Sequence, residues 1–417
     1  MSRSRTPRIL ILGANFAGLA AARAIPASVD VTVVDRGPSF EWLPNIHELV
    51  SRHRTPASLR VDRRRMVRRA GHRFLRAEVR DLDPARGVAV TEAGRELRFD
   101  ACVVATGGVH DDFGVKGVAR HSMPFKSVSD CDAIGRRLAE LARDSSRHDA
   151  ATFTVVIVGG GIEGIECLGE VLRRYRDHHA LRVHVLDAAP RLLAAAPPAV
   201  DAAVRAHCAS LPVEFHMNTR VKSVTPNGVS LAGKTRPRAF LKADIVIWNG
   251  GAKPSPLLVR AGLADGPREW APVAATLQST RFPNVFVAGD AASLPRPLSK
   301  QAYFALDMGA QAGENAARFV AGLAPHTFRP SPKPMLLAFG DLDTFLVGES
   351  FVLAGTALAL AKEAVLQATL AQLDPPADLD AAWALGNRLL AGFRAAALPE
   401  LSSVQRLLRL PGIRVLR

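Results

Sequence analysis

Two carboxylates in this chain each follow a glycine-rich turn at a spacing suited to holding a ribose. Asp35 comes 22 positions after Gly13, and Asp187 comes 28 positions after Gly159. A glycine-rich turn that opens a helix offers backbone N–H groups to a pyrophosphate, and an acid about 20 residues further on binds a ribose hydroxyl. The two spacings therefore predict two binding sites for dinucleotides.

The residues around Gly13 predict a strand–turn–helix–strand unit. Residues 9–12 are an apolar run typical of a buried parallel strand, residues 16–24 are alanine-rich and predict a helix, and residues 31–34 predict a second strand. Asn15 stands where G-x-G-x-x-G has its middle glycine, so its side chain must bend away from the phosphates or donate to them. The residues expected to bind this dinucleotide are Gly13, Asn15, Phe16, Ala17, Gly18, Asp35 and Arg36.

The same unit recurs 146 positions later, where the glycine fingerprint is complete. The expected strands are residues 153–158 and 182–186, with a helix over 163–175 between them. Such an internal repeat predicts an α/β fold with two Rossmann-like dinucleotide-binding domains, antiparallel β insertions and a C-terminal helical extension. The residues expected to bind the second dinucleotide are Gly159, Gly161, Ile162, Glu163, Gly164 and Asp187.

Three further buried strands end in small residues, which let a cofactor approach the backbone. They lie within residues 99–108, 242–251 and 282–291. The loop over residues 40–49 is either a cover for a ring-shaped ligand or an ordinary packed connection. The cofactor-binding residues expected from these segments are Pro44, Ala105, Thr106, Gly107, Gly251, Gly289 and Asp290.

The composition limits the classes of partner. The 417 residues carry 54 basic and 39 acidic side chains, a net charge of +15 that favours anionic partners. The arginine-rich stretch 52–80 contains one aromatic residue, Phe74, so a solvated face or a patch for a membrane or an acidic partner is expected, and nucleic acid is not. The four cysteines are scattered, which argues against disulfides and cysteine zinc sites and suits a reducing cytoplasm. No metal ligands are predicted.

The expected division is into domains that interrupt one another. Residues 1–145 and 276–330 form the first dinucleotide-binding domain, residues 146–275 form the second, and residues 331–417 form a leucine- and alanine-rich C-terminal domain with two or three helices. Its last segment, from Ser403, is both basic and apolar. Such a segment lies in a membrane interface, or packs on the protein or on a partner copy in a homodimer.

Together, the two fingerprints, Ala105-Thr-Gly and Gly289-Asp290 resemble those of flavoproteins with two dinucleotide-binding domains. Over roughly residues 8–325 the chain looks most like type II NADH dehydrogenases and the related sulfide:quinone oxidoreductases and flavocytochrome c sulfide dehydrogenases. The resemblance implies FAD in the first unit and NAD(P)H in the second. Asp187 favours NADH because a carboxylate repels a 2′-phosphate, although Arg191 lies nearby.

The resemblance also implies three catalytic residues: Glu166, Lys300 and Tyr303. Glu166 matches a glutamate near the flavin–nicotinamide contact, where it positions the nicotinamide or relays a proton; the other interpretation is a polar anchor between helix and sheet. Tyr303 and Asp307 replace the glutamines that type II enzymes associate with the quinone site. Lys300 and Tyr303 fit a stretch of the sulfide-oxidising relatives, whereas Cys167 matches one of their redox cysteines without a partner.

The sequence thus predicts an FAD-dependent NAD(P)H oxidoreductase that passes hydride from NADH to FAD and electrons to a small, quinone-like acceptor. The expected location is the cytoplasm, peripheral on the inner face of the membrane. Three alternatives stay open: a soluble NAD(P)H-dependent reductase of a protein or small molecule, a sulfide:quinone-type enzyme, and a redox-sensing flavoprotein without turnover.

Overall fold

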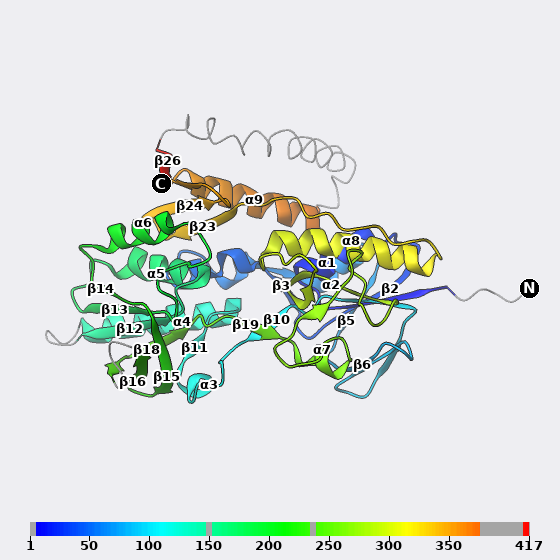
Figure 1. The fold of residues 1–417 in the computed structure, drawn as a ribbon, viewed down its shortest axis with the longest axis horizontal. Helices are drawn as coiled ribbons and strands as arrows, with labels where there is room; N and C mark the ends of the chain where they lie inside the picture. The colour runs from blue at the N-terminus through cyan, green and yellow to red at the C-terminus, as the bar shows by residue number, and fades with distance from the viewer. Residues whose placement is uncertain (1–5, 147–151, 234–238, 376–411, 417) are drawn as a thin grey trace, which may run out of the picture. The chain divides into compact units, whose positions relative to one another are not determined.

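The structure is a computed structural model that describes residues 6–146, 152–233, 239–375 and 412–416 (Figure 1). The chain divides into two compact units. Unit 1 comprises residues 1–41, 60–110 and 252–332, and unit 2 comprises residues 42–59, 111–251 and 333–417.

Unit 1 is built on a five-stranded parallel sheet. Its strands, in spatial order, are β21 (Val285–Val287), β9 (Ala101–Val104), β1 (Arg8–Leu12), β2 (Asp30–Asp35) and β5 (Arg73–Arg76). The central strands β1 and β9 are apolar and almost wholly buried, as expected for a parallel sheet covered on both faces.

Two helices of unit 1 cross closely next to this sheet. Helix α1 (Phe16–Ala24) and helix α8 (Ala302–Val320) run side by side, as the blue and yellow helices of Figure 1 show. A Cβ atom on Gly309 would lie 2.1 Å from the carbonyl oxygen of Ala17, and one on Gly313 would lie 2.4 Å from that of Ala21. The two glycines of α8 therefore permit the crossing.

Shorter elements complete unit 1. The strands β6 (Val79–Asp83), β7 (Val88–Thr91) and β8 (Glu96–Arg98) form the expected antiparallel insertion. The remaining elements are β3 (Ser39–Glu41), β4 (Arg60–Asp62), α2 (Arg63–Arg69), β10 (Gly108–His110), β19 (Ala252–Pro254), α7 (Pro256–Arg260), β20 (Ala271–Pro272), η3 (Gly289–Ala291) and β22 (Ala292–Ser293).

Unit 2 contains a second five-stranded parallel sheet. Its strands, in spatial order, are β11 (Met123–Pro124), β18 (Ile245–Trp248), β12 (Phe153–Val158), β13 (Leu181–Leu186) and β14 (Val213–His216). The helices of this part are α3 (Val118–His121), α4 (Val128–Ser145), α5 (Ile162–Tyr175) and α6 (Pro198–Cys208). The side chain of Ser127 caps α4 by accepting from the amide of Asp130 at 3.1 Å.

A meander of β15 (Thr219–Thr225), β16 (Gly228–Gly233) and β17 (Phe240–Lys242) belongs to the same unit. Its apolar side chains share a buried cluster with Val156, Leu186 and Trp248 of the parallel sheet. Two short 3₁₀ helices, η1 (Leu43–Leu49) and η2 (Pro56–Leu59), also lie in unit 2. η1 packs closely against α4 at Gly135. A Cβ on Gly135 would lie 2.3 Å from the Leu49 carbonyl oxygen, so only glycine permits this contact.

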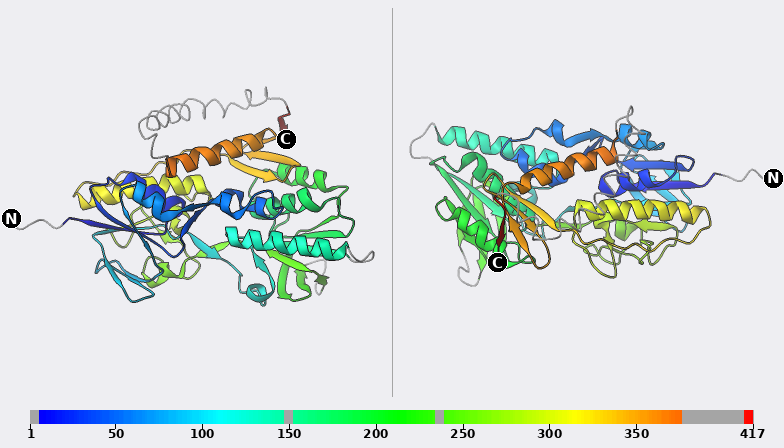
Figure 2. Two further views of the ribbon diagram at one scale, coloured as in Figure 1. Left: turned by 180° about the vertical axis from the view of Figure 1, so that it is seen from behind. Right: turned by 90° about the horizontal axis from the view of Figure 1, so that it is seen from above.

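The C-terminal part begins with strands, which the leucine- and alanine-rich composition did not predict. β23 (Met335–Phe339), β24 (Asp343–Val347), β25 (Val352–Ala354) and β26 (Arg414–Leu416) form an antiparallel sheet. Helix α9 (Leu358–Leu373) follows β25 and is the orange helix beside the gold strands in Figure 2. The described part of this region therefore contains a helix, as expected, in addition to the strands. Of the predicted membrane or dimer segment, residues 403–411 lie outside the described residues.

Among the described residues, no helix combines the length and apolarity needed to cross a bilayer.

Candidate functional site

The two glycine turns have the same geometry. Gly13 and Gly159 have φ values of +96° and +102°, which only glycine adopts without strain. A Cβ on Gly13 would lie 2.3 Å from the carbonyl oxygen of Ala105, and one on Gly159 would lie 2.4 Å from that of Asn249. Each turn therefore passes directly over the end of a neighbouring parallel strand.

The third glycine of each fingerprint packs its helix onto the turn. A Cβ on Gly18 would lie 1.8 Å from the carbonyl oxygen of Gly13, and one on Gly164 would lie 1.8 Å from that of Gly159. Any larger residue would push the helix N-terminus away from the strand end, which is where a pyrophosphate binds in such units.

In both turns, the aspartate accepts a hydrogen bond from the amide of the residue that follows the first glycine. Asp35 Oδ2 accepts from the Ala14 amide at 2.8 Å, and Asp187 Oδ2 accepts from the Gly160 amide. Asp35 Oδ1 also accepts from Arg63 Nη1 at 2.7 Å, and Arg63 Nε donates to the Ala14 carbonyl at 2.7 Å. The two carboxylates thus lie at the turns, as their spacing predicts, and Arg63 is a partner that the motif did not reveal.

The N-termini of α1 and α5 keep their first amides available to a ligand. Neither helix has a side-chain capping hydrogen bond. Asn15 is the N-cap residue of α1, but its side chain exchanges two hydrogen bonds with the backbone of Glu41, at 3.3 and 3.2 Å. Its side chain therefore bends away from the helix end, the first of the two options that the sequence left open. Uncapped amides and the helix dipole together favour an anion such as a pyrophosphate.

Buried polar atoms at both turns fit dinucleotide ligands. Within the described residues, the hydroxyl of Thr106 and both amide atoms of Asn249 are buried without a hydrogen-bond partner. Unpaired buried polar groups are costly, so they mark positions where a ligand supplies the partner. Thr106 follows β9 beside the Gly13 turn, and Asn249 follows β18 beside the Gly159 turn. Sequence reasoning named Thr106 but missed Asn249, although it follows a strand that ends in small residues.

Lys300, Asp290 and Trp270 meet in unit 1. The Lys300 ammonium lies 3.4 Å from the centroid of the Trp270 ring and donates to the backbone oxygen of Asp290. Tyr303 is the second residue of α8 and is half-buried. Gly289 has φ +66°, and a Cβ there would lie 3.1 Å from that of Ala17 on α1.

The remaining predicted residues are distributed over both units. Arg36 is exposed and lies 3.5 Å from Glu78 in unit 1. Pro44 opens η1 in unit 2, Gly251 has φ +112° after β18, and Glu163 lies 3.4 Å from Lys126. Glu166 belongs to unit 2, whereas Lys300 and Tyr303 belong to unit 1. The roles assigned to all these residues stay predictions.

Glu166 lies in a buried polar cluster within unit 2. Its Oε1 accepts from the ammonium of Lys362 on α9 at 2.6 Å and from the amide of Ala338 at 3.2 Å. Its Oε2 lies 3.4 Å from Nδ1 of His47, whose Nε2 lies 3.4 Å from the same ammonium. Lysine, glutamate and histidine thus form a closed triangle, which we call the Glu166 cluster.

Burial in the Glu166 cluster shifts the pKa values of its carboxyl and its imidazole toward the uncharged forms. Burial raises the pKa of Glu166, although the Lys362 ammonium and the Ala338 amide lower it. Burial and the Lys362 charge lower the pKa of His47 well below its usual value. One turn further along α5, burial raises the pKa of Glu170 to about 7; its carboxylate contacts Ser51 and Arg173. A carboxyl with a pKa near 7, such as that of Glu170, exchanges protons near neutral pH.

The four cysteines give no sign of a dithiol centre. Cys102, Cys131, Cys167 and Cys208 all lie within the described ranges and are free, buried thiols. Burial raises the pKa of Cys167, so its thiol stays protonated and unreactive.

These features define a class: an α/β protein with two Rossmann-like sites for dinucleotides and a buried cluster of ionisable side chains. Residues 7–309 match the family described as pyridine nucleotide-disulphide oxidoreductase, and the chain belongs to this family. Family membership confirms the predicted enzyme class, and FAD and a pyridine nucleotide are the cofactors of the family.

Relatives with known activities are similar over most of their length. The chain is 25% identical to the demethylphylloquinone reductase of Synechocystis over 375 residues, which cover 86% of this chain and 91% of that protein. It is 25% identical to a type II NADH:quinone oxidoreductase of Mycobacterium tuberculosis over 316 residues, 69% of this chain and 67% of that protein.

Solved structures confirm the predicted fold. The sulfide:quinone oxidoreductase of Aquifex aeolicus superimposes with a TM-score of 0.78 at 15% identity, covering 98% of this chain and 97% of that chain. NDH2 of Plasmodium falciparum, in complex with NADH, gives a TM-score of 0.74 at 15% identity, with 88% and 95% covered.

Proposed function

We propose that this protein is an FAD-dependent NADH:quinone oxidoreductase of type II. The observation that carries the proposal is the pair of glycine turns of equal geometry, each with an aspartate on its second amide. The relatives named for quinone reduction support the choice of acceptor. When bound, FAD accepts hydride from the nicotinamide and passes electrons on to the acceptor.

In this proposal the Gly13 turn holds FAD and the Gly159 turn holds NADH. The uncapped amides of α1 and α5 bind the two pyrophosphates, and Thr106 and Asn249 donate to the ligands or accept from them. Asp187 accepts from the amides of Gly160 and Ala189. These two hydrogen bonds fix the carboxylate beside the turn, where it can bind ribose hydroxyls and repel a 2′-phosphate, so NADH is favoured over NADPH.

The Glu166 cluster has the chemistry needed to move protons during quinone reduction. Reducing a quinone to a quinol consumes two protons with two electrons, and buried sites need side chains to deliver them. Burial favours the protonated form of the Glu166 carboxyl, which has a proton to donate, and the Lys362 ammonium opposes this shift of the pKa. Lys362 donates to His47 Nε2, which leaves the ring proton on Nδ1, facing Glu166 Oε2. We assign Glu166 the role of proton donor, with Lys362 and His47 as its positioning residues.

An anaerobic titration tests the proposed function. NADH should bleach the flavin absorbance of the purified protein, and a short-chain quinone should restore it. Absence of bleaching by NADH and by NADPH would refute the oxidoreductase proposal. Bleaching without recovery by quinone would refute the quinone acceptor and favour another small molecule or a protein, consistent with Tyr303 and Asp307 at the positions of the family's glutamines.

Glu166→Gln tests the proton role separately. The variant should be reduced by NADH at the normal rate but should reoxidise with quinone about 10²-fold more slowly, the usual cost of losing a general acid. Glu140→Gln is the control, because Glu140 is on the surface of α4 and pairs with Arg137 alone among the residues described. Equal reoxidation rates for Glu166→Gln and the wild type would contradict the role.

The site of action follows from the acceptor. We propose that the protein works in the cytoplasm, peripherally on the inner face of the membrane, because quinones are lipophilic. The net charge of +15 supports contact with an acidic lipid surface. The basic, apolar segment from Ser403 suits the same contact or the interface of a homodimer.

A further inference from the structure

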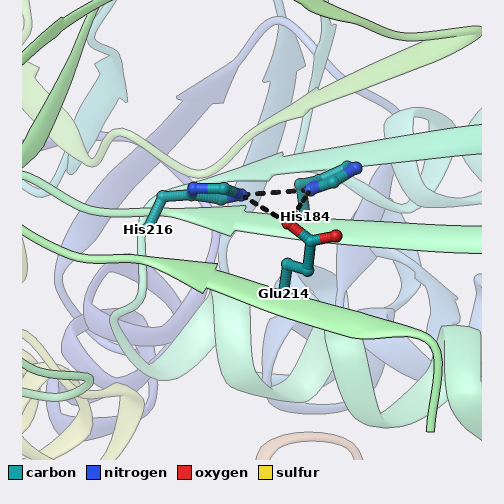
Figure 3. A group of neighbouring side chains, drawn as sticks. All are labelled: His184, Glu214 and His216. Atoms are coloured by element: carbon teal, nitrogen blue, oxygen red, sulfur yellow. Dashed lines mark hydrogen bonds and ion pairs between the residues drawn. The ribbon is translucent and has the colours of Figure 1, made fainter. Parts of the chain in front are cut away.

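Three potential metal ligands converge on one face of the parallel sheet in unit 2. His184 lies on β13, and Glu214 and His216 lie two residues apart on the neighbouring strand β14. Residues two apart on a strand point to the same face, and the register pairs His184 with Glu214. Figure 3 shows the three side chains pointing toward one another.

The distances within this group match those of a tetrahedral metal site. Nδ1 of His184 lies 3.1 Å from Nε2 of His216, and each nitrogen lies 3.6 Å from Oε2 of Glu214. Bonds of about 2.0–2.1 Å at tetrahedral angles put ligand atoms about 3.3–3.4 Å apart. A square-planar arrangement with the same bonds would put neighbouring ligand atoms about 2.8–2.9 Å apart. The observed mean is therefore closer to the tetrahedral value.

The site is open on one side. The imidazole side chains are 13% and 14% exposed, whereas the Glu214 side chain is 68% exposed. β14 is the edge strand of its sheet, and His184 and Glu214 line a surface hollow of about 550 Å³ together with Arg182 and Pro212. An ion can therefore enter from solvent, and a water molecule from the hollow can complete the coordination.

We propose that His184, Glu214 and His216 bind a divalent transition-metal ion, with Zn²⁺ as the best match. Two imidazoles and a carboxylate suit zinc better than calcium or magnesium, which prefer oxygen ligands. The ion would join the edge strand β14 to β13 through side chains, in addition to their backbone hydrogen bonds.

The bound ion would also lie close to the second glycine turn. The amide of Asp187, three residues after His184, donates to the carbonyl oxygen of His216 at 3.1 Å. The metal site and the ribose-binding carboxylate therefore share a stretch of backbone. The metal proposal itself depends on neither NADH binding nor catalysis, because its ligands and its test are independent of them.

The experiment is a titration of the FAD-loaded, chelator-treated protein with Zn²⁺ in competition with a chromogenic chelator. We expect one equivalent to bind and the melting temperature to rise. His184→Ala and His216→Ala should each weaken binding at least about tenfold, since even the loss of groups that only orient a ligand costs 10- to 100-fold. His53→Ala is the matched control, because His53 is an exposed histidine of the same unit.

The outcomes separate a metal site from a hydrogen-bonded cluster. X-ray absorption of the zinc-loaded protein should show nitrogen and oxygen neighbours at about 2.0–2.1 Å. Failure to bind Zn²⁺ in competition would overturn the proposal. Equal binding by wild type and both histidine variants would do so as well, because the ion would then be held elsewhere. Should a variant fold poorly, Glu214→Gln provides the same test at an exposed position and should also weaken binding.

Discussion

Replacing Lys362 by methionine should destabilise the protein strongly, although Lys362 lies far from both glycine turns in the sequence. The ammonium is 2.6 Å from Glu166 Oε1 and 3.4 Å from His47 Nε2, and the side chains of Lys362 and Glu166 are 8% and 9% exposed. Methionine preserves most of the apolar stem but removes the charge. It therefore takes the ammonium away from the buried Glu166 carboxylate, whose other polar neighbours include the Ala338 amide and, at 3.4 Å, Nδ1 of His47.

The expected loss follows from the cost of an unpaired buried charge. Removing one member of a buried ion pair costs about 3–5 kcal/mol. A unit of 150–250 residues loses about 2–4 °C of melting temperature per kcal/mol, so Lys362→Met should melt about 6–20 °C below the wild type. The variant Lys362→Met/Glu166→Gln, which removes both charges, should recover most of the loss, because a neutral pair of similar volume carries no comparable penalty.

The pH dependence gives the prediction a sign. Losing Lys362 removes an interaction that lowers the pKa of Glu166, so the folded variant has a higher Glu166 pKa than the folded wild type. A carboxyl whose folded pKa is raised contributes most to stability below its unfolded pKa, and this contribution is lost as pH rises through the folded pKa. The gap between Lys362→Met and the wild type should therefore be larger at pH 8 than at pH 5.

Thermal unfolding of the FAD-loaded protein at several pH values is the assay. Lys242→Met is the control, since Lys242 is exposed on β17, and it should change stability by less than about 0.5 kcal/mol. A Lys362→Met variant with the same melting temperature as Lys242→Met would refute the assignment of a buried ion pair. So would a double variant that is less stable than Lys362→Met.

Two further predictions concern Glu170 and Asn249. Burial raises the pKa of Glu170 from 4.5 to about 7, so the free energy of unfolding of the wild type should fall by up to about 3 kcal/mol as pH rises between these values. This pH-dependent loss should vanish in Glu170→Gln. Parallel pH–stability profiles of the two proteins in denaturant unfolding would contradict the prediction. Asn249→Ala should weaken NADH binding about tenfold, the worth of one or two hydrogen bonds, in an equilibrium titration, whereas Asn227→Ala on an exposed turn should not. An unchanged NADH affinity in Asn249→Ala would count against Asn249 as a ligand-binding residue.

Local spacing predicted the parts of the fold whose cause is local. The helix expected over residues 16–24 is α1, and the one expected over 163–175 differs from α5 by one residue. Gly13 and Gly159 were identified because a strand, a turn and a helix follow one another at fixed distances. The positive φ values of these glycines, and their close approach to the neighbouring strand ends, are requirements of the turn itself. The short motif that reveals the turn therefore also predicts them.

The Glu166 cluster could not be predicted in the same way. Lys362 is 196 positions from Glu166 and 315 positions from His47. In the sequence, Lys362 ends an apolar run that begins at Phe351. In the structure it is buried, which a lysine tolerates when a carboxylate partner is present. One sequence does not state which distant acid that partner is.

The metal ligands show an intermediate case. Glu214 and His216 alternate along a strand, so their common face could be read from the sequence. His184 joins them through the register of two parallel strands, which depends on the helix and loops between residues 186 and 213. The absence of paired cysteines gave no information about this group, because its ligands are imidazoles and a carboxylate.

Asn15, which replaces the middle glycine of the motif, shows whether the fold or the ligand is the reason for a glycine at that position. Asn15 and Gly161 have φ values of −107° and −76°, which any residue adopts, and a Cβ on Gly161 would meet nothing within 4 Å. Neither backbone strain nor packing therefore demands glycine at the middle position of these turns. What remains is the space that a pyrophosphate needs above the helix end. The side chain of Asn15 is held by the backbone of Glu41 and so leaves that space open. The first turn can therefore accept a pyrophosphate although it lacks the middle glycine of G-x-G-x-x-G.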